Sequence, residues 1–143
     1  MEAKYHMSPK FLIDFETTNK QIQNYFAAHT ELQIITGFIG SSESGETTTI
    51  GRSGSDYTAS IFASAVDATA LEIWTDVNGM FTANPRIVKQ AQPIATISYQ
   101  EAMELSHFGA KVLYPPTIQP VLNKNIPIWI KNTFEPKAEG TLI

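Results

Sequence analysis

The sequence predicts an α/β protein with a largely parallel sheet, and three observations support this fold class. Short apolar runs of β-branched and aromatic residues alternate with stretches whose apolar residues recur at helical spacing. The 143 residues are 43% hydrophobic and 17% charged, which suits one domain with a core and excludes a disordered chain. No internal repeat or low-complexity segment interrupts the alternation. In such folds, ligands gather at the carboxyl ends of the strands.

The amino-terminal stretch is predicted to form a strand followed by a helix. The apolar run 11–15 is short and β-like, and it stops at 16–19, where hydroxyl side chains can cap a helix. From 20 to 29 the apolar positions fall close to helical spacing, which predicts a helix with one buried stripe.

A hairpin is predicted next. The β-rich run 32–39 and the β-branched stretch 47–50 flank a Gly- and Ser-rich turn at 40–45. This hairpin delivers the chain to the glycine-containing loop 51–56.

Helices and strands alternate through the rest of the chain. The predicted elements are a helix over 57–66, a buried strand at 71–75, a turn at 76–79, a long irregular loop from 80 to 93, a helix from 98 to 109, a short helix at 117–123, a strand at 126–130 and a polar tail at 134–140. Ser98 and Glu101 form a capping box, and Pro127 must lie at a sheet edge or a strand start.

The composition excludes several classes of function. The formal net charge of -4 leaves no basic surface for nucleic acid or an anionic membrane. The absence of cysteine excludes a disulfide scaffold, a zinc-thiolate site and a thiol nucleophile, and the three scattered histidines suggest no metal cage. No apolar run is long enough for a membrane helix and residues 1–10 do not resemble a signal peptide, so we expect a cytoplasmic protein.

The strongest local motif is Gly51-Arg52-Ser53-Gly54-Ser55-Asp56, which opens onto a predicted helix. Its glycines let the backbone approach a ligand, the helix start supplies unpaired N–H groups, and the arginine adds a forked cation. These features predict a site for a carboxylate or a phosphate. The alternative is an ordinary turn, with Ser55 as helix cap, Arg52 in solvent and Asp56 as a helix-dipole residue.

A second group of polar residues follows the predicted strand at 71–75. Thr75 and Asp76 stand at its carboxyl end, and the loop beyond carries Phe81 and Arg86. A hydroxyl, a carboxylate, a ring and an arginine at that edge suit the base, ribose and phosphates of a nucleotide. The alternative is that Asp76 forms a turn and Arg86 is an ordinary surface residue.

Three further residues are interpreted from their sequence neighbours. Lys111 follows a helix C-terminus, where a lysine most often compensates the helix dipole, and it joins the nucleotide group only if the preceding loop folds over it. Trp74 and Trp129 lie inside apolar strands, so we expect them in the core rather than in base stacking.

Ordered motifs over residues 34–143 resemble the aspartokinase family. They are Thr36-Gly37-Phe38-Ile39-Gly40, Thr47 through Tyr57, Ile73-Trp74-Thr75-Asp76-Val77, Pro85-Arg86-Ile87-Val88, Ser98 through Leu105, Phe108 through Leu113 and Gly140-Thr141-Leu142-Ile143. Such a series is far more specific than any single motif. The amino-acid sequence at 99–105 and 130–133 is most similar to the kinase portion of bifunctional aspartokinase/homoserine dehydrogenases.

The resemblance implies a fold, an activity and roles for residues. The implied fold is the three-layer α/β/α sandwich of the amino acid kinases, with a mainly parallel sheet. The implied reaction transfers the ATP γ-phosphate to the side-chain carboxylate of L-aspartate, at the entrance to lysine, threonine and methionine biosynthesis, with Mg2+ held mainly through the phosphates. The implied residues are Arg52, Ser53, Gly54 and Ser55 for aspartate, Asp56 and Lys111 for catalysis, and Thr75, Asp76, Phe81, Arg86 and Lys111 for ATP.

Four positions depart from the family pattern. Ser53 stands where relatives often have Gly, and Tyr114 where His commonly precedes the proline. Phe81 replaces the usual Tyr, so it keeps ring packing and loses a hydroxyl. Asn84 replaces the usual Asp, which removes a charge with little change of shape.

Some family features are not found in these 143 residues. They are the Lys-Phe-Gly-Gly strand, the upstream glutamate that helps bind aspartate, and the ACT domains that normally follow. We therefore expect residues 1–29 to be a partial lead-in segment and 30–143 the nucleotide-binding portion of a kinase domain. The parent chain would carry ACT domains and, in the bifunctional form, a homoserine dehydrogenase domain.

The fragment itself is expected to be catalytically silent, and its exposed apolar surface could promote association into a homo-oligomer. Three alternatives remain for the function. One is another kinase of the same family, acting on glutamate, acetylglutamate or uridylate. The second is a non-catalytic nucleotide-binding or regulatory module, and the third is a passive folding unit whose exposed sheet face pairs with another copy of the chain.

Overall fold

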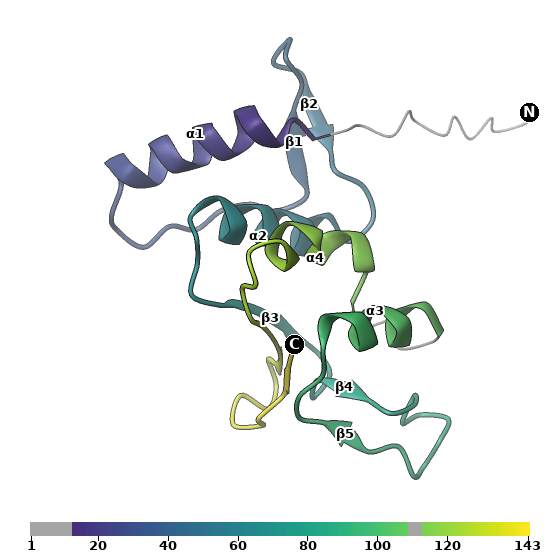
Figure 1. Ribbon diagram of the computed structural model, residues 1–143. Helices are drawn as coiled ribbons and strands as arrows, with labels where there is room; N and C mark the ends of the chain where they lie inside the picture. Colours follow the sequence, from purple (N-terminus) through teal and green to yellow (C-terminus); the bar gives the residue numbers. More distant parts are fainter. Residues whose placement is uncertain (1–12, 109–112) are drawn as a thin grey trace, which may run out of the picture.

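The computed structural model describes residues 13–108 and 113–143. The elements are α1 (Phe15–Ala28), β1 (Ile39–Ser41), β2 (Thr47–Thr49), α2 (Gly54–Ala65), β3 (Leu71–Thr75), β4 (Met80–Phe81), β5 (Pro93–Ile94), α3 (Tyr99–Phe108), α4 (Pro115–Leu122), β6 (Ile128–Asn132) and β7 (Thr141–Leu142). Figure 1 shows α2 and α4 between the hairpin β1–β2 and the strand β3. Within the described residues, no helix is both long and apolar enough to span a bilayer.

The main sheet has the strand order β3-β6-β7. β3 and β6 are parallel, whereas β7 is antiparallel to β6 because the short segment between them cannot form a crossover. The pairs β1–β2 and β4–β5 form separate antiparallel ribbons. The predicted α/β class and hairpin are therefore confirmed, and the sheet in the described residues is mixed.

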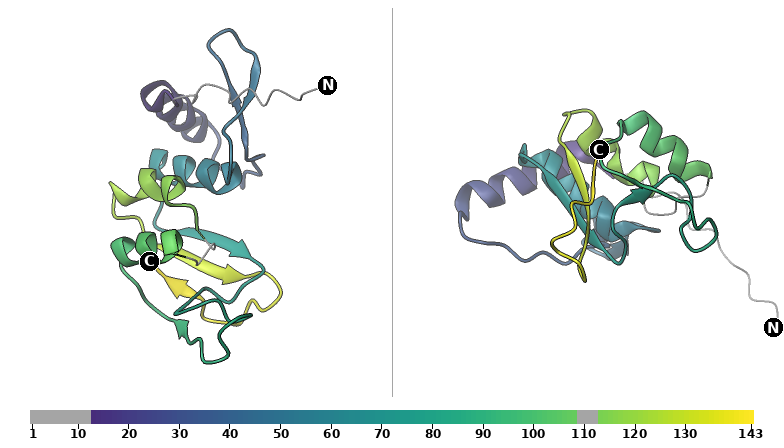
Figure 2. Two further views of the ribbon diagram at one scale, coloured as in Figure 1. Left: turned by 90° about the vertical axis from the view of Figure 1, so that its right-hand side faces the viewer. Right: turned by 90° about the horizontal axis from the view of Figure 1, so that it is seen from below.

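The core lies between one face of the sheet and the helices. Alternate residues of β3 and β6 are buried there, and α2 and α4 pack against each other above them. The core side chains include Ala63, Leu71, Ile73, Ile118, Val121, Ile128 and Ile130. Figure 2 shows α2 and α4 on one side of this sheet.

The opposite face of the sheet corrects the expectation that both tryptophans lie in the core. The side chain of Trp74 is 44% exposed, while Trp129 is half-buried. Lys131 Nζ lies 5.2 Å from the Trp74 ring and 2.7 Å from Glu72 Oε1. Because side chains alternate along a strand, the tryptophans fall on the face away from the helices, which apolar content alone could not indicate.

The helix α1 begins five residues earlier than predicted. Asp14 is its N-cap and accepts a hydrogen bond from the Thr17 amide at 3.1 Å, so Phe15 is helical and the strand predicted at 11–15 is wrong where it is described. Residues 11 and 12 lie outside the described residues. A carboxylate directly before the helix caps it better than the hydroxyls inside it, and Ile22 then packs in a small cluster with α2.

The run 32–39 is a strand only at Ile39. Leu32 and Ile34 are 94% and 97% exposed, and no strand of the described residues pairs with 32–37. A β-rich sequence becomes a strand only when a neighbour satisfies its backbone groups. The prediction of a strand over 32–38 is therefore wrong for this chain.

The loop predicted from 80 to 93 instead begins and ends in the ribbon β4–β5, where Phe81 lies opposite Pro93. Two-residue strands are too short to show an alternating pattern in sequence. The capping box is confirmed, since Glu101 Oε2 accepts hydrogen bonds from both the amide and the hydroxyl of Ser98. Pro127 directly precedes β6, as its missing N–H requires.

Candidate functional site

The loop 51–56 makes a tight turn into α2. Gly51 and Ser53 have φ values of 83° and 55°, and the Gly54 amide donates to the Gly51 carbonyl at 3.1 Å. Ser53 is the N-cap and makes no side-chain capping bond, so Ser55 lies in the first turn and is not the cap. The Gly54 amide is used in this turn and the Tyr57 amide donates to the Ser53 carbonyl, so the amides of Ser55 and Asp56 are the N–H donors that this helix start can offer to a ligand.

A close contact with the hairpin fixes this turn in place. A Cβ on Gly54 would lie 2.6 Å from Phe38 Cδ2, so only glycine allows the approach. The Phe38 amide donates to Thr58 Oγ1 at 3.0 Å, and the same hydroxyl donates to the Gly54 carbonyl at 2.8 Å. The base of the hairpin is thus fastened to the first turn of α2, which sets the position of Arg52.

Asp56 and Arg52 differ in their surroundings. Asp56 lies in the first turn of α2 and is half-buried, and this burial raises the pKa of its carboxyl. Arg52 is exposed, and it takes part in neither of the two ion pairs found among residues 13–108 and 113–143. A solvent-facing guanidinium beside helix amides is suited to a carboxylate or phosphate ligand.

Thr75 and Asp76 stand at the carboxyl end of β3, as predicted. Thr75 Oγ1 donates to Asp76 Oδ1 at 3.2 Å, and Asp76 is exposed. The buried side chain of Asn132, opposite Thr75 on β6, donates to Asn78 Oδ1 at 2.5 Å and so holds the turn after β3. Sequence reasoning missed Asn132, although a polar residue ending an apolar strand is a usable signal.

The ribbon β4–β5 carries the other predicted nucleotide residues. Phe81 is half-buried on β4, and Arg86 is exposed in the turn beyond it. Asn84 Oδ1 accepts a hydrogen bond from the Arg86 amide at 3.0 Å. An amide oxygen thus supplies the acceptor that a carboxylate would supply, so the change from the usual Asp leaves this turn intact.

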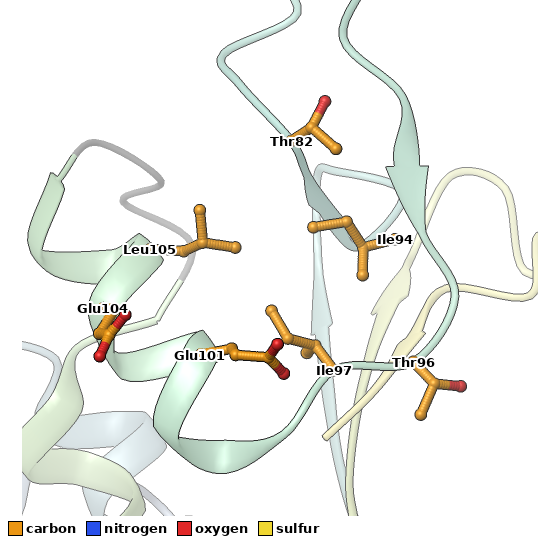
Figure 3. Close-up of a pocket in the computed structure, with 7 residues that line it drawn as sticks. All are labelled: Thr82, Ile94, Thr96, Ile97, Glu101, Glu104 and Leu105. Carbon is orange, nitrogen blue, oxygen red and sulfur yellow. The ribbon is translucent and has the colours of Figure 1, made fainter.

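A pocket of about 470 Å³ lies between the ribbon and α3. Figure 3 shows Ile94, Ile97 and Leu105 around it, with Thr82 on the ribbon side and Glu101 and Glu104 on α3. Apolar walls with a few polar groups are typical of small-molecule pockets. Neither Phe81 nor Arg86 lines this pocket.

The two predicted groups lie at the same edge of the fold. α2 and β3 are joined by the short connection 66–70 and run in opposite directions, so the start of the helix and the end of the strand face the same side (Figure 1). A single cleft shared by Arg52, Asp76 and Arg86 stays a prediction. Lys111 lies outside the described residues. In the described ranges, no three His, Asp or Glu side chains gather as a metal cage.

The sequence matches the model of the amino acid kinase family over residues 4–132. It is 47% identical to the bifunctional aspartokinase/homoserine dehydrogenase of Buchnera aphidicola over 131 residues, which is 92% of this chain and 16% of that protein. The aspartate kinase of Clostridium acetobutylicum superposes with a TM-score of 0.84 at 44% identity, over 92% of this chain and 30% of that one.

A third relative is Escherichia coli aspartokinase III in complex with aspartate and ADP. It superposes with a TM-score of 0.82 at 43% identity, over 90% of this chain and 29% of that one. The chain therefore spans from about a sixth to under a third of the length of these relatives. The family match covers most of the chain, and the fold agrees with solved aspartate kinases along almost its whole length, so the chain belongs to the amino acid kinase family.

Proposed function

We propose that the chain forms the nucleotide-binding part of an aspartate kinase, which phosphorylates the side-chain carboxylate of L-aspartate with ATP. The observation that carries this proposal is the start of α2, where Arg52 is exposed beside free helix amides and Asp56 is half-buried. The similar aspartokinase III is described as a complex with aspartate and ADP, which is the ligand pair this proposal requires.

The chemistry suits these residues. An oxygen of the aspartate side chain would attack the γ-phosphorus, and the bond from phosphorus to the bridging oxygen would break to release ADP. Both reactants are anions, so transfer depends on neutralising charge and aligning the two groups. We assign Arg52 and the α2 amides, with Ser53 and Ser55, to the aspartate carboxylates, and Asp56 to the organisation of the catalytic centre.

Thr75, Asp76, Phe81 and Arg86 are assigned to ATP, together with Lys111. The hydroxyl and carboxylate at the end of β3 suit a ribose, and the ring of Phe81 suits packing against a base. When bound, Mg2+ would neutralise phosphate charge, and we expect it to be held mainly through the nucleotide phosphates and water.

Calorimetry of the 143-residue chain with ATP and magnesium tests the nucleotide assignment. We expect saturable binding that Asp76→Ala weakens about tenfold, the loss expected when one charge-assisted contact is removed. Lys137→Ala, an exposed change in the polar tail, is the control. Wild-type chain that binds no ATP would contradict the proposal.

A coupled ADP-release assay tests the reaction. We expect the longer parent protein to turn over aspartate, and not glutamate, acetylglutamate or uridylate, whereas the 143-residue chain should show no turnover. Turnover by this chain at ordinary kinase rates of about 1 to 100 per second would contradict the expectation that it is catalytically inactive.

We also propose that the parent protein is cytoplasmic and carries ACT and homoserine dehydrogenase domains. Cellular fractionation tests the localisation, and the flanking sequence tests the domains.

A further inference from the structure

The buried hydroxyl of Thr141 stands where the ribbon β4–β5 meets the main sheet. Thr141 belongs to β7, pairs with Ile130 of β6, and has no exposed surface. Its Oγ1 accepts a hydrogen bond from the Met80 amide at 2.7 Å and donates one to the Ile94 carbonyl at 2.6 Å. Met80 and Ile94 are register partners in the ribbon, so one hydroxyl satisfies a group on each ribbon strand.

The backbone around Thr141 is shaped to allow this contact. A Cβ on Gly79 would clash with Thr141 Oγ1, and Gly79 has a φ of 95°. A Cβ on Gly140 would clash with the Ile130 carbonyl oxygen. Side chains are excluded at both glycines, so the turn after β3 and the start of β7 can approach each other closely.

We propose that Thr141 is a positioning residue for nucleotide binding, which it serves by fixing the ribbon that carries Phe81 and leads to Arg86. Met80 directly precedes Phe81, so the Thr141 hydroxyl holds β4 against the sheet, while the backbone of Leu142 holds the chain after β5 through hydrogen bonds with Ala95 and Ile97. This inference rests on the proposed function, because it assumes that the ribbon contacts ATP. It does not require Thr141 to touch the nucleotide.

The isosteric change Thr141→Val tests this role. Valine keeps the shape and leaves the buried Met80 N–H and Ile94 C=O without partners, a costly arrangement that the ribbon can relieve only by moving. We expect the Kd for ATP, measured by calorimetry with magnesium, to rise about tenfold, which is about 1.4 kcal/mol. Thr141→Ser keeps the hydroxyl and should bind ATP within about twofold of the wild-type chain.

The control Thr69→Val makes the same chemical change at an exposed site between α2 and β3, and we expect it to leave ATP binding unchanged. Hydrogen exchange provides a readout that does not depend on ATP. The Met80 amide should lose protection in Thr141→Val and keep it in Thr141→Ser. If Thr141→Val does not fold, Thr141→Cys replaces it, and we expect an intermediate Kd because a thiol forms weaker hydrogen bonds.

The possible results distinguish a failure of this inference from a failure of the proposed function. Tight ATP binding by Thr141→Val, or by Thr141→Cys where it replaces the valine variant, overturns this inference and leaves the proposed function standing. Weak binding by Thr141→Ser overturns it as well, since the hydroxyl is then not the operative group. A wild-type chain that binds no ATP contradicts the proposed function and this inference together.

Discussion

Arg52 and Asp56 lie at the same helix start and differ in exposure. This difference in exposure distinguishes the proposed ligand-binding role of Arg52 from the proposed organising role of Asp56. Arg52 faces solvent, so its guanidinium can bind a ligand and contributes little to the fold. Asp56 is partly removed from water, so its carboxyl resists ionisation. Sequence spacing predicted that both residues stand beside the helix amides, while only their exposure in the folded chain indicates which of them can reach a ligand.

Replacing Arg52 with glutamine should affect catalysis and not stability. We expect the free energy of unfolding of the chain to change by less than about 0.5 kcal/mol, because the residue is exposed. In the parent enzyme, kcat/KM for aspartate should fall about 100-fold, as expected when a forked guanidinium no longer makes two charge-assisted hydrogen bonds to a carboxylate. Urea unfolding and steady-state kinetics measure the two effects. Lys89→Gln, an exposed cation in the turn of the ribbon, is the matched control and should leave both unchanged.

The pH dependence of stability should have opposite signs at Asp56 and Glu72. Burial raises the pKa of Asp56 in the folded chain, so the folded state holds the proton more tightly and stability falls as the pH rises above about 4. The hydrogen bond from Lys131, and then that from Trp74, lowers the pKa of Glu72, so its contribution is present above about pH 4 and is lost as the pH falls through the folded value.

Urea unfolding between about pH 3 and pH 7 tests this pair of signs. As the pH rises, the free energy of unfolding of Asp56→Asn should increase relative to that of the wild-type chain. The free energy of unfolding of Glu72→Gln should decrease relative to the wild-type chain over the same range. The two variants thus control for each other. A shift in the same direction for both would contradict the assigned causes.

At the scale of elements, the contact between the hairpin and α2 is the feature that shapes the site. Gly54 lets the backbone of Phe38 approach the first turn of the helix, and the Thr58 hydroxyl bonds to both segments. The sequence indicates a glycine in a turn, but the neighbour that requires it is 16 residues earlier in the chain. Such a contact has no local sequence signal, because the two segments meet only after the hairpin folds back on the helix.

Replacing Gly54 with alanine should therefore separate the hairpin from the helix. The new Cβ would lie 2.6 Å from Phe38 Cδ2 and 3.2 Å from Phe38 Cα, and the second contact is with backbone. We expect a loss of about 1–3 kcal/mol in the free energy of unfolding, measured in urea. Ser55→Ala, at an exposed position of the same helical turn, is the control and should change it by less than about 0.5 kcal/mol. Equal stability of the two variants would contradict the contact.

At the scale of the whole molecule, apolar residues remain exposed over the segment before the hairpin. Leu32 and Ile34 are almost fully exposed, and Ile35, Phe38 and Ile39 are between 42% and 51% exposed. Residues 32–37 have the β-rich composition of a strand but no pairing strand among the described residues, whereas Ile39 belongs to β1 and pairs with Thr49. Unpaired β-prone segments of this kind favour association with another chain.

We predict that the 143-residue chain self-associates through this segment. Sedimentation velocity should show an apparent mass that rises with concentration, and the double change Leu32→Lys and Ile34→Lys should reduce that rise. Ile87→Lys replaces another exposed isoleucine, on the ribbon, and serves as the control. Association that persists in the double variant would place the contact elsewhere on the surface.

The sequence by itself determined the α/β class, the longer helices and strands, and the residue types at the two polar groups. Helical spacing in α2, the apolar run of β3 and the capping box of α3 are local signals, and each is present in the structure. The family resemblance added the expected roles of Arg52, Asp56, Asp76 and Arg86, since the spacing of these residues alone left Arg52 open and favoured ordinary turn or surface residues for the other three.

The tertiary structure decided the features that depend on a partner distant in sequence. It placed Trp74 on the open face of the sheet, left 32–37 without a strand neighbour, and turned the expected loop after β3 into a ribbon. It also brought Thr141 to Met80, across 61 residues of chain. Local sequence sets backbone preference and side-chain chemistry, whereas burial and pairing depend on which segments meet, and only the folded chain fixes that.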